Sequence, residues 1–360
     1  MLLVRGLPLA VVLLAVCGVT GCKRQKPPPR TRIWMGLTHA CAMQKSGEVE
    51  CWGRNDKGQL GDGTLETRLR PAAVALSSVD TAHAAELALG LRHTCLLPPA
   101  GAARPGVRCW GDDERGQIGK GLEALTGVTT IRASGDQTCA LSDAIRCWGN
   151  DRGVHEVAGL AGRATALSMG DGFVCGALAD PKVVRCSGTD ERGESAGNKP
   201  VLVGAAVTML TSGSKHTCAL LDDGAIQCWG KNDQGQLGNG TTVDAPAPAI
   251  VHGLPPAVEV KAGSIHTCAR LRTNTVACWG DNHAHQLANG TRESSSRPAP
   301  VNGLVGVQEL AAGGESTCAR LTEGHVRCWG NNAFGQLGDG TTTEHDVPMP
   351  VKSPLPAAAK

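Results

Sequence analysis

Short apolar runs alternate along the chain with glycine, proline, asparagine and aspartate, which recur every few residues. The runs are of the type found in β-strands, and none repeats its apolar positions with the 3.6-residue period of a helix. The residues between them are those that favour turns. The pattern therefore predicts an all-β structure of short strands joined by tight turns.

A different kind of apolar run lies near the N-terminus. It extends from Leu7 to Val16, is too short to span a bilayer, and leads to small residues before Cys22. This arrangement resembles a bacterial lipoprotein signal, which predicts a leader of residues 1–21 and acyl chains on Cys22 that anchor the protein in a membrane. The alternative is an ordinary secretory signal, with Cys22 as a spare thiol. Both interpretations predict an exported chain. The lipoprotein interpretation places the protein in the cell envelope, and the sequence does not distinguish the inner from the outer membrane.

The segment after the leader predicts a tether. Residues 22–32 carry five basic side chains and three consecutive prolines, a composition that favours an extended spacer of roughly 30 Å. The basic side chains would lie against anionic headgroups. We expect the folded domain to occupy residues 33–353, followed by a flexible tail of residues 354–360.

One motif recurs throughout the predicted domain. The tripeptide Cys-Trp-Gly occurs six times, and a degenerate seventh copy is Cys186-Ser187-Gly188. Most copies are followed by a glycine-rich stretch, such as Gly-Gln-Leu-Gly at residues 235–238. Repeats of about 45 residues with short strands suit four-stranded propeller blades, because each blade covers its apolar faces with its neighbours. The sequence therefore predicts a seven-bladed β-propeller.

The segment between the two cysteines of a repeat reads as a β-hairpin. In residues 218–228, three residues lie on each side of a three-residue loop that ends in Gly224. A type I turn with a bulge needs a positive φ at that position, which glycine adopts readily. Pairing outward from the loop places Cys218 opposite Cys228 at a non-hydrogen-bonded site. Cα atoms at such a site lie about 4.5 Å apart, close enough for a disulfide.

The cysteine count extends this expectation to every blade. Of 16 cysteines, Cys17 lies in the leader and Cys22 takes lipid, which leaves 14, or two per blade. An oxidising compartment would join them in local pairs, although reduced core cysteines are the competing interpretation. No close paired-cysteine spacing suggests a metal, and we expect none. The predicted disulfides are Cys41–Cys51, Cys95–Cys109, Cys139–Cys147, Cys175–Cys186, Cys218–Cys228, Cys268–Cys278 and Cys318–Cys328.

Proline-rich strands suggest how the ring closes. We expect internal repeats to begin with segments such as residues 297–301, whereas the first repeat, from Ile33, lacks one. A similar segment, residues 347–351, lies at the C-terminal end. We therefore expect the last strand to complete the first blade, which would remove an exposed edge.

Charge and aromatic content argue against nucleic-acid binding. Lys+Arg 35 against Asp+Glu 33 leaves a net charge of +2, without the basic surplus that phosphate binding needs. The chain has no tyrosine and two phenylalanines, so platforms for stacking bases are scarce. We expect a monomer with no nucleic-acid partner.

Four repeats share a histidine two residues before the first cysteine. Its position is taken by Gln137, Phe173 and Ser316 in the other repeats. A catalytic or metal-binding ring is one hypothesis, but replacement by phenylalanine favours a structural side chain that bonds its own blade's backbone. The four histidines are His39, His93, His216 and His266.

Other candidate sites are few. Residues 55–63 superficially resemble a calcium loop but lack its alternating oxygens and terminal glutamate, so turn chemistry explains them. The Cys-Trp-Gly tryptophans are expected to pack between blades. Trp34 lies outside the repeat pattern and is a candidate exposed contact for a partner, with a core residue at the ring seam as the alternative. Phe334, where other repeats have a polar or charged residue, is a second candidate contact.

The repeats together resemble a known family. The pattern Gly-x-x-His-Thr-Cys-Ala-Leu, then Cys-Trp-Gly-x-Asn, then Gly-Gln-Leu-Gly, quoted from residues 213–241, is similar to the regulator of chromosome condensation repeat. The resemblance covers roughly residues 33–353 and implies a seven-bladed β-propeller. The guanine-nucleotide exchange and chromatin binding of the family's eukaryotic founder are not carried over, because export removes both partners.

No nucleophile elbow, phosphate loop or carboxylate pair stands out in the sequence. We therefore expect a non-enzymatic, membrane-anchored binding propeller without cofactor, which presents a loop face to a protein or glycan partner. One alternative is an envelope enzyme, such as a polysaccharide lyase or hydrolase, with His and Asp/Glu at the channel mouth. Another is an inhibitor of an exported enzyme such as a β-lactamase. Fold alone does not separate these functions.

Overall fold

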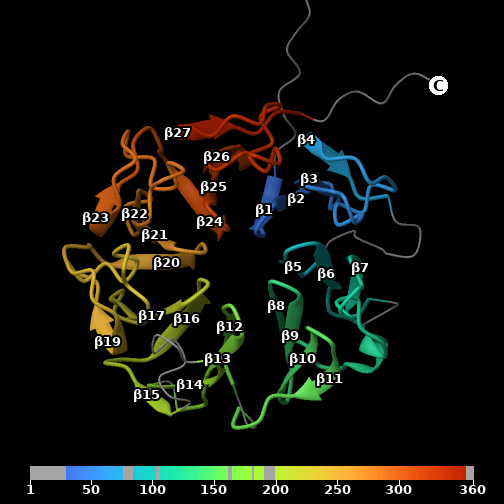
Figure 1. The fold of residues 1–360 in the computed structure, drawn as a ribbon, viewed down its shortest axis with the longest axis horizontal. Helices are drawn as coiled ribbons and strands as arrows, with labels where there is room; N and C mark the ends of the chain where they lie inside the picture. Colours follow the sequence, from blue (N-terminus) through green and yellow to red (C-terminus); the bar gives the residue numbers. More distant parts are fainter. Residues whose placement is uncertain are drawn as a thin grey trace, which may run out of the picture.

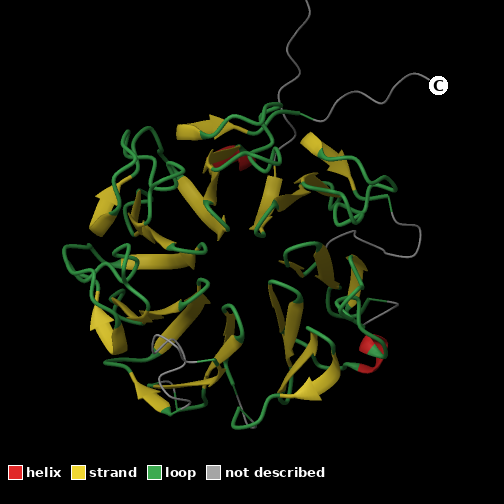
Figure 2. Ribbon diagram, viewed as in Figure 1, coloured by secondary structure: helices red, strands yellow, loops and turns green. Residues whose placement is uncertain are grey.

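The computed structural model describes residues 30–75, 84–102, 106–160, 164–180, 182–189 and 199–353. Seven antiparallel sheets stand around a central channel (Figures 1 and 2). Six sheets have four strands, and the sheet of the second blade has three. The predicted all-β, seven-bladed propeller is therefore confirmed. The leader, the lipid on Cys22 and the C-terminal tail lie outside the described residues.

Each blade is a meander in which consecutive strands pair, from an inner strand beside the channel to an outer strand at the rim (Figure 1). Blades one to three consist of β1 (Arg30–Met35), β2 (His39–Gln44), β3 (Val49–Gly53) and β4 (Arg68–Ala73); β5 (Glu86–Leu89), β6 (His93–Leu97) and β7 (Arg108–Gly111); and β8 (Thr130–Ser134), β9 (Gln137–Leu141), β10 (Ile145–Gly149) and β11 (Arg152–Glu156). Blades four and five consist of β12 (Ala166–Met169), β13 (Phe173–Ala177), β14 (Val183–Gly188) and β15 (Pro200–Leu202); and β16 (Val207–Ser212), β17 (His216–Leu221), β18 (Ile226–Gly230) and β19 (Ala245–Ile250). Blades six and seven consist of β20 (Ala257–Ala262), β21 (His266–Leu271), β22 (Val276–Gly280) and β23 (Ser295–Pro300); and β24 (Val307–Gly313), β25 (Ser316–Leu321), β26 (Val326–Gly330) and β27 (His345–Pro350).

Only two short 3-10 turns, η1 (Leu122–Ala124) and η3 (Thr322–Gly324), interrupt this all-strand pattern in the described residues. No helix there is long and apolar enough to cross a membrane.

The loops divide between two faces because the strands of a blade alternate in direction. Every inner strand begins at one face, which carries the hairpin turns, such as residues 222–225, and the links between blades, such as residues 301–306. We name it the connector face. Every inner strand ends at the opposite face, which carries the Gly-x-x-His turns, such as residues 263–265, and long loops, such as residues 231–244. We name it the loop face.

The central hairpin of each blade has the predicted register. Cys218 lies opposite Cys228, and Gly224, the last residue of the three-residue loop, has φ 91°. The structure joins the same seven cysteine pairs that the sequence predicts, each with a Cα–Cα distance of 4.0 or 4.1 Å. Cysteine pairs with so short a Cα–Cα distance occupy non-hydrogen-bonded sites of the hairpin, as predicted from the sequence.

The core is divided among the interfaces between blades. At a typical interface, Trp279 of one blade packs against Leu237 of the preceding blade's long loop and against Cys218 beneath it. Its indole Nε1 donates to the carbonyl oxygen of Gln236, at 2.9 Å. The indoles of Trp52, Trp110, Trp148 and Trp329 make the corresponding bond across their own interfaces. The expectation that these tryptophans pack between blades is confirmed.

Ring closure differs from the sequence expectation. The C-terminal strand β27 pairs with β26 in the seventh blade and not with the first blade, which has its own outer strand, β4. The proline-rich segments form the last strand of their blades and not the first, so the first blade is complete with its four strands β1 to β4. The seam is closed by packing of β1 against β24 and β25 and by the Trp52 bond to Gln336. The first blade also begins at Arg30, within the predicted tether.

Candidate functional site

The inner strands line a channel with two cavities. The cavity toward the connector face has a volume of about 210 Å³ and is lined by charged side chains, including Arg32, Glu86 and Lys261. Its charges are paired: Arg32 Nε lies 3.3 Å from Oε1 of Glu309, and the Arg132 guanidinium contacts Glu86. The second cavity, toward the loop face, has a volume of about 90 Å³ and is lined mainly by glycine and serine.

The channel does not assemble the acid and base that the enzyme alternative needs. Among the described residues that line the two cavities there is no histidine. The carboxylates of Glu86 and Glu309 are each held by an arginine of a neighbouring blade. Both carboxylates therefore take part in ion pairs that join neighbouring blades.

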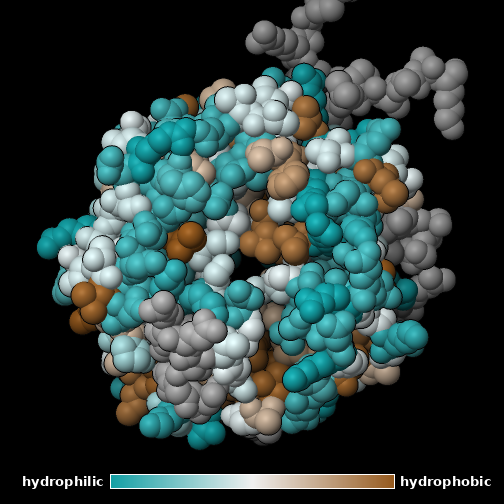
Figure 3. Space-filling model, in the orientation of Figure 1, coloured by the Kyte–Doolittle hydropathy of each residue, from teal (hydrophilic) through white to brown (hydrophobic). Residues whose placement is uncertain are grey.

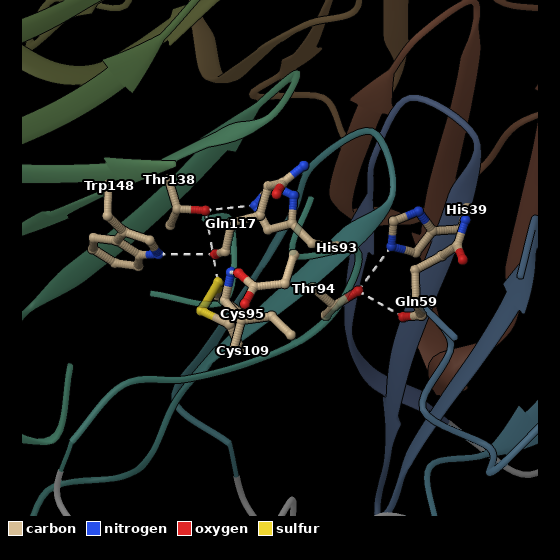
Figure 4. The surroundings of a disulfide bond; sticks show 11 residues. His39, Gln59, His93, Thr94, Cys95, Cys109, Gln117, Thr138 and Trp148 are labelled. Carbon is tan, nitrogen blue, oxygen red and sulfur yellow. Dashed lines mark hydrogen bonds between the residues drawn. A yellow bond between two sulfur atoms is a disulfide. The ribbon is translucent and has the colours of Figure 1, made fainter. Parts of the chain in front are cut away.

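The four predicted histidines lie at the blade interfaces, close to the loop face. Each is fully buried, and its Nε2 lies 2.7 to 2.9 Å from the hydroxyl oxygen of a threonine in the next blade. Figure 4 shows two of these contacts, those of His39 and His93. The expected bond to the same blade's backbone is therefore wrong, because each ring contacts a side chain of the next blade. The pairs are His39 with Thr94, His93 with Thr138, His216 with Thr267, and His266 with Thr317.

The first interface shows where the proton lies on these rings. Thr94 donates its hydroxyl hydrogen to the carbonyl oxygen of Gln59, at 2.8 Å, so His39 Nε2 must donate to the threonine oxygen. His39 is therefore the neutral Nε2–H tautomer, and its buried Nδ1 has no hydrogen-bond partner among the described residues. Burial, together with the nearby His93, lowers the pKa of His39 to about 3.

The glycine of the Gly-x-x-His motif makes room for the ring. A Cβ atom at Gly263 would lie 2.1 Å from Cε1 of His266, far inside contact distance. The backbone of this turn continues the interface, because Ser264 donates its amide to the carbonyl oxygen of Gly314, at 2.7 Å. The histidines are therefore parts of a rigid collar, and none is free to act on a ligand.

Buried asparagines hold the long loops of the loop face. Asn232 donates through Nδ2 to the carbonyl oxygens of Thr241 and Val243, both at 3.0 Å, and its Oδ1 accepts from the amide of Leu237. In the first blade, the corresponding Asn55 donates to Asp62, whose carboxylate also binds Arg68. The described residues contain no group of three or more side chains arranged to hold a metal ion. The hydrogen bonds of Asn55 and Asp62 show what these two side chains of the calcium-like spacing do within the loop.

The loop face carries ion pairs between neighbouring blades. Arg115 of the second blade lies 3.2 Å from Asp136 of the third. Lys57 and Glu114 join the first blade to the second in the same way. Most of the surface in Figure 3 is hydrophilic, with apolar atoms beside the central opening. The face is thus polar and preorganised.

The two candidate contact residues lie in different environments. Trp34 is only 9% exposed and packs in the core between the first two blades, with Arg32 over its ring. Trp34 is thus a core residue, as the alternative expected, but it lies between the first and second blades and not at the ring seam; the expectation of an exposed anchor is wrong. Phe334 is partly buried on the loop face, with the Arg54 guanidinium carbon 4.9 Å from its ring centre.

Comparison with known proteins identifies the repeats. The model of the regulator of chromosome condensation (RCC1) repeat matches residues 46–97, 223–270, 275–320 and 323–357, about half of the chain. A second model with the same description matches residues 207–236, 257–286 and 307–336.

Curated relatives match only in part. The human E3 ubiquitin-protein ligase HERC2 is 30% identical over 243 residues, which cover 62% of this chain and 4% of the ligase. The Ultraviolet-B receptor UVR8 of Arabidopsis thaliana is 27% identical over 241 residues, which cover 62% of this chain and 47% of the receptor. The chain thus spans less than half the length of these relatives.

Solved structures share the fold. Yeast RCC1 (Prp20), in its complex with Kap60, aligns with a TM-score of 0.73 and 17% identity over 93% of this chain and 91% of that one. The ectodomain of the Arabidopsis thaliana receptor kinase ACR4 aligns with a TM-score of 0.56 and 21% identity over 88% and 94%. The repeat matches, together with seven blades in one ring, show that this chain belongs to the regulator of chromosome condensation repeat family.

Proposed function

We propose that the protein is a lipid-anchored, non-enzymatic propeller of the cell envelope whose loop face binds a protein partner. The proposal joins two lines of support. The leader and Cys22 favour export and acylation, and two cysteines per blade, all within disulfide distance, suit an oxidising compartment. The repeat family and the polar loop face favour binding to another protein.

The observation that carries the binding role is the rigidity of the loop face. Its long loops are fixed by buried asparagines such as Asn232, and its charges by ion pairs between blades such as Arg115 with Asp136. Preorganised polar groups bind a partner with little further loss of conformational entropy. Yeast RCC1, which shares the fold, is itself seen bound to the protein Kap60. A protein partner is therefore favoured over a glycan.

Phe334 marks the part of the loop face that best suits an interface. It is a large apolar side chain among polar neighbours, and Arg54 from the adjacent blade lies over its ring. Aromatic and arginine side chains contribute most of the binding energy at many protein interfaces. The seam between the seventh and first blades is thus the expected centre of contact.

Site-directed photocrosslinking in intact cells tests the binding role. A benzophenone amino acid at position 334 should capture a partner, whereas the same residue at Val305, on the connector face, should not capture it. Capture at both positions or at neither would contradict binding through the loop face. Turnover of a hydrolase or lyase panel by the purified oxidised protein would contradict the non-enzymatic assignment.

Mass spectrometry tests the anchor separately. The mature chain should begin at Cys22 and carry acyl chains, and Cys22→Ser should move the protein from the membrane to the soluble fraction. An unmodified Cys22 would contradict the anchor without bearing on the partner.

A further inference from the structure

Among the residues that the structure describes, the second blade has no outer strand. Its sheet ends at β7, whereas the other six blades each add a fourth strand outside the equivalent of β7. The residues after β7 form irregular turns and η1 before β8 begins. Within the described residues, no strand pairs with the outer edge of β7. An open position for one strand therefore remains in an otherwise regular ring.

The backbone of Cys109 faces this open position. Cys109 pairs with Cys95 across a Cα distance of 4.0 Å, which identifies a non-hydrogen-bonded pair. The amide and carbonyl of Cys109 must then point away from β6. In other blades the same groups meet the fourth strand, as where Cys51 pairs with Ala72 and Cys278 pairs with Ala299.

Side-chain exposure supports the same conclusion. Cys109 is partly exposed, whereas Cys51, Cys228, Cys278 and Cys328 at the equivalent position are fully buried beneath their outer strands. The end of the edge at the connector face is covered by the segment that contains Glu123, because a Cβ atom at Gly106 would lie 2.4 Å from the Cα of Glu123. The accessible part of the edge therefore runs from Cys109 to Gly111.

The edge of β7 also lacks the protection that most other edges have. Outer strands β4, β15, β19, β23 and β27 contain proline, which has no amide hydrogen and blocks further pairing. β11 has no proline but carries Arg152, His155 and Glu156 instead. β7 has neither proline nor alternating charges around Cys109.

The outer strands of the other blades show which peptide fits. In β4, Ala72 lies opposite Cys51 and turns its amide inward, whereas Pro71 and Ala73 turn outward. In β23, Ala299 lies opposite Cys278 between two prolines. A peptide that fits this position is therefore extended. The residue opposite Cys109 must be small and must carry an amide hydrogen that points toward β7, whereas any residue, including proline, is tolerated where the amide points away from the sheet.

We propose that the edge of β7 binds an extended, proline- and alanine-rich segment of a partner protein as the fourth strand of the second blade. This inference rests on the proposed binding function and locates a second contact outside the loop face. The main-chain hydrogen bonds of the added strand supply affinity, and the small residue opposite Cys109 supplies selectivity.

Peptide binding to the full-length oxidised protein tests the proposal. The probe is a fluorescent peptide with the sequence of residues 70–75, Arg-Pro-Ala-Ala-Val-Ala, measured by anisotropy. An N-methyl group on the first alanine removes the inward amide and should weaken binding at least tenfold. The matched control carries the N-methyl group on the second alanine, whose amide faces outward, and should bind within twofold of the parent peptide.

Hydrogen exchange locates the bound peptide. Binding should slow exchange of the Cys109 amide and leave the Cys51 and Cys278 amides unchanged. Absence of binding, equal sensitivity to the two N-methyl groups, or slowed exchange in another blade would overturn the proposal. Capture of a partner through position 334 does not depend on this peptide, so the two proposals can fail separately.

Discussion

At the scale of single residues, buried neutral histidines make the ring sensitive to acid. Burial lowers the pKa of His266 to about 4 and that of His216 to about 3, against an ordinary value of 6.5. Between the folded and the unfolded pKa of such a histidine, the unfolded chain binds more protons than the folded one. The contribution of the histidine to the free energy of unfolding is therefore fully present above the unfolded pKa of 6.5, and it is lost as the pH falls toward the folded pKa. Each histidine should cost about 2 kcal/mol of unfolding free energy between pH 7 and pH 5.

His266→Gln isolates one of these contributions. Glutamine is a natural choice, because Gln137 occupies the same position in the third blade. Urea unfolding of the oxidised protein at pH 7 and pH 5 should show the difference between the two pH values shrink by about 2 kcal/mol. His252→Gln, which removes an exposed histidine, should leave the difference unchanged. An unaltered pH dependence in His266→Gln would show that this ring titrates normally.

The disulfide next to the open edge should be the first to be reduced. Access of a thiolate to sulfur limits thiol–disulfide exchange, and Cys109 is partly exposed whereas Cys268 and Cys278 are fully buried. Brief treatment with a mild reductant, followed by alkylation and peptide mass spectrometry, should label Cys95 and Cys109 before the others. Equal labelling of Cys268 and Cys278 would contradict an open edge in the second blade.

At the scale of the element, one asparagine amide holds the long loop in the first, fifth, sixth and seventh blades. In Asn232→Asp the side chain keeps its shape but loses both amide hydrogens, and a buried carboxylate then faces two carbonyl oxygens. We expect a loss of about 2 to 4 kcal/mol in unfolding free energy, measured by denaturation at pH 7. Asn239→Asp is the matched control, because Asp62 and Asp339 already occupy that position in other blades. Equal losses in both variants would refute this account of the loop.

Elements differ in how far the sequence predicts them. The hairpin between Cys218 and Cys228 follows from turn chemistry and pairing alone, because all its constraints are local. Ring closure does not, since a proline-rich segment suits the beginning or the end of a blade equally well. The three-stranded second blade does have a signal in the sequence, because residues 112–129 contain no proline-rich segment of the kind seen in the later blades.

The histidine partners were available in the sequence but not recognised. Wherever a repeat has histidine at this position, the next repeat has threonine directly before its first cysteine, as with His266 and Thr317. Gln137 and Ser316 instead precede repeats with Val174 and Ala40, which have no hydroxyl. Correlation between neighbouring repeats therefore indicates contacts between blades, whereas each repeat read alone suggests contacts within one blade.

At the scale of the whole molecule, Arg30 sets the orientation of the ring on the proposed membrane. Its guanidinium is fully buried and lies 3.1 Å from Glu50, so the chain leaves the propeller at the start of β1, on the connector face. Residues 22–29 can span at most about 28 Å when extended. An acylated Cys22 would therefore keep the connector face near the lipid and turn the loop face away from it. The same face exposes Val305, which is 84% accessible.

Energy transfer to the bilayer surface measures this orientation. Donor dyes attached to Val305→Cys on the connector face and to Val243→Cys on the loop face are compared in vesicles that contain an acceptor-labelled lipid. Transfer should be stronger from position 305, because the thickness of the propeller separates the two positions. Lengthening the tether with a flexible Gly/Ser insert after Pro29 should reduce the difference, since it frees the ring to rotate. Stronger transfer from position 243 in an acylated protein would mean that the loop face lies against the membrane, where a soluble partner could not reach it.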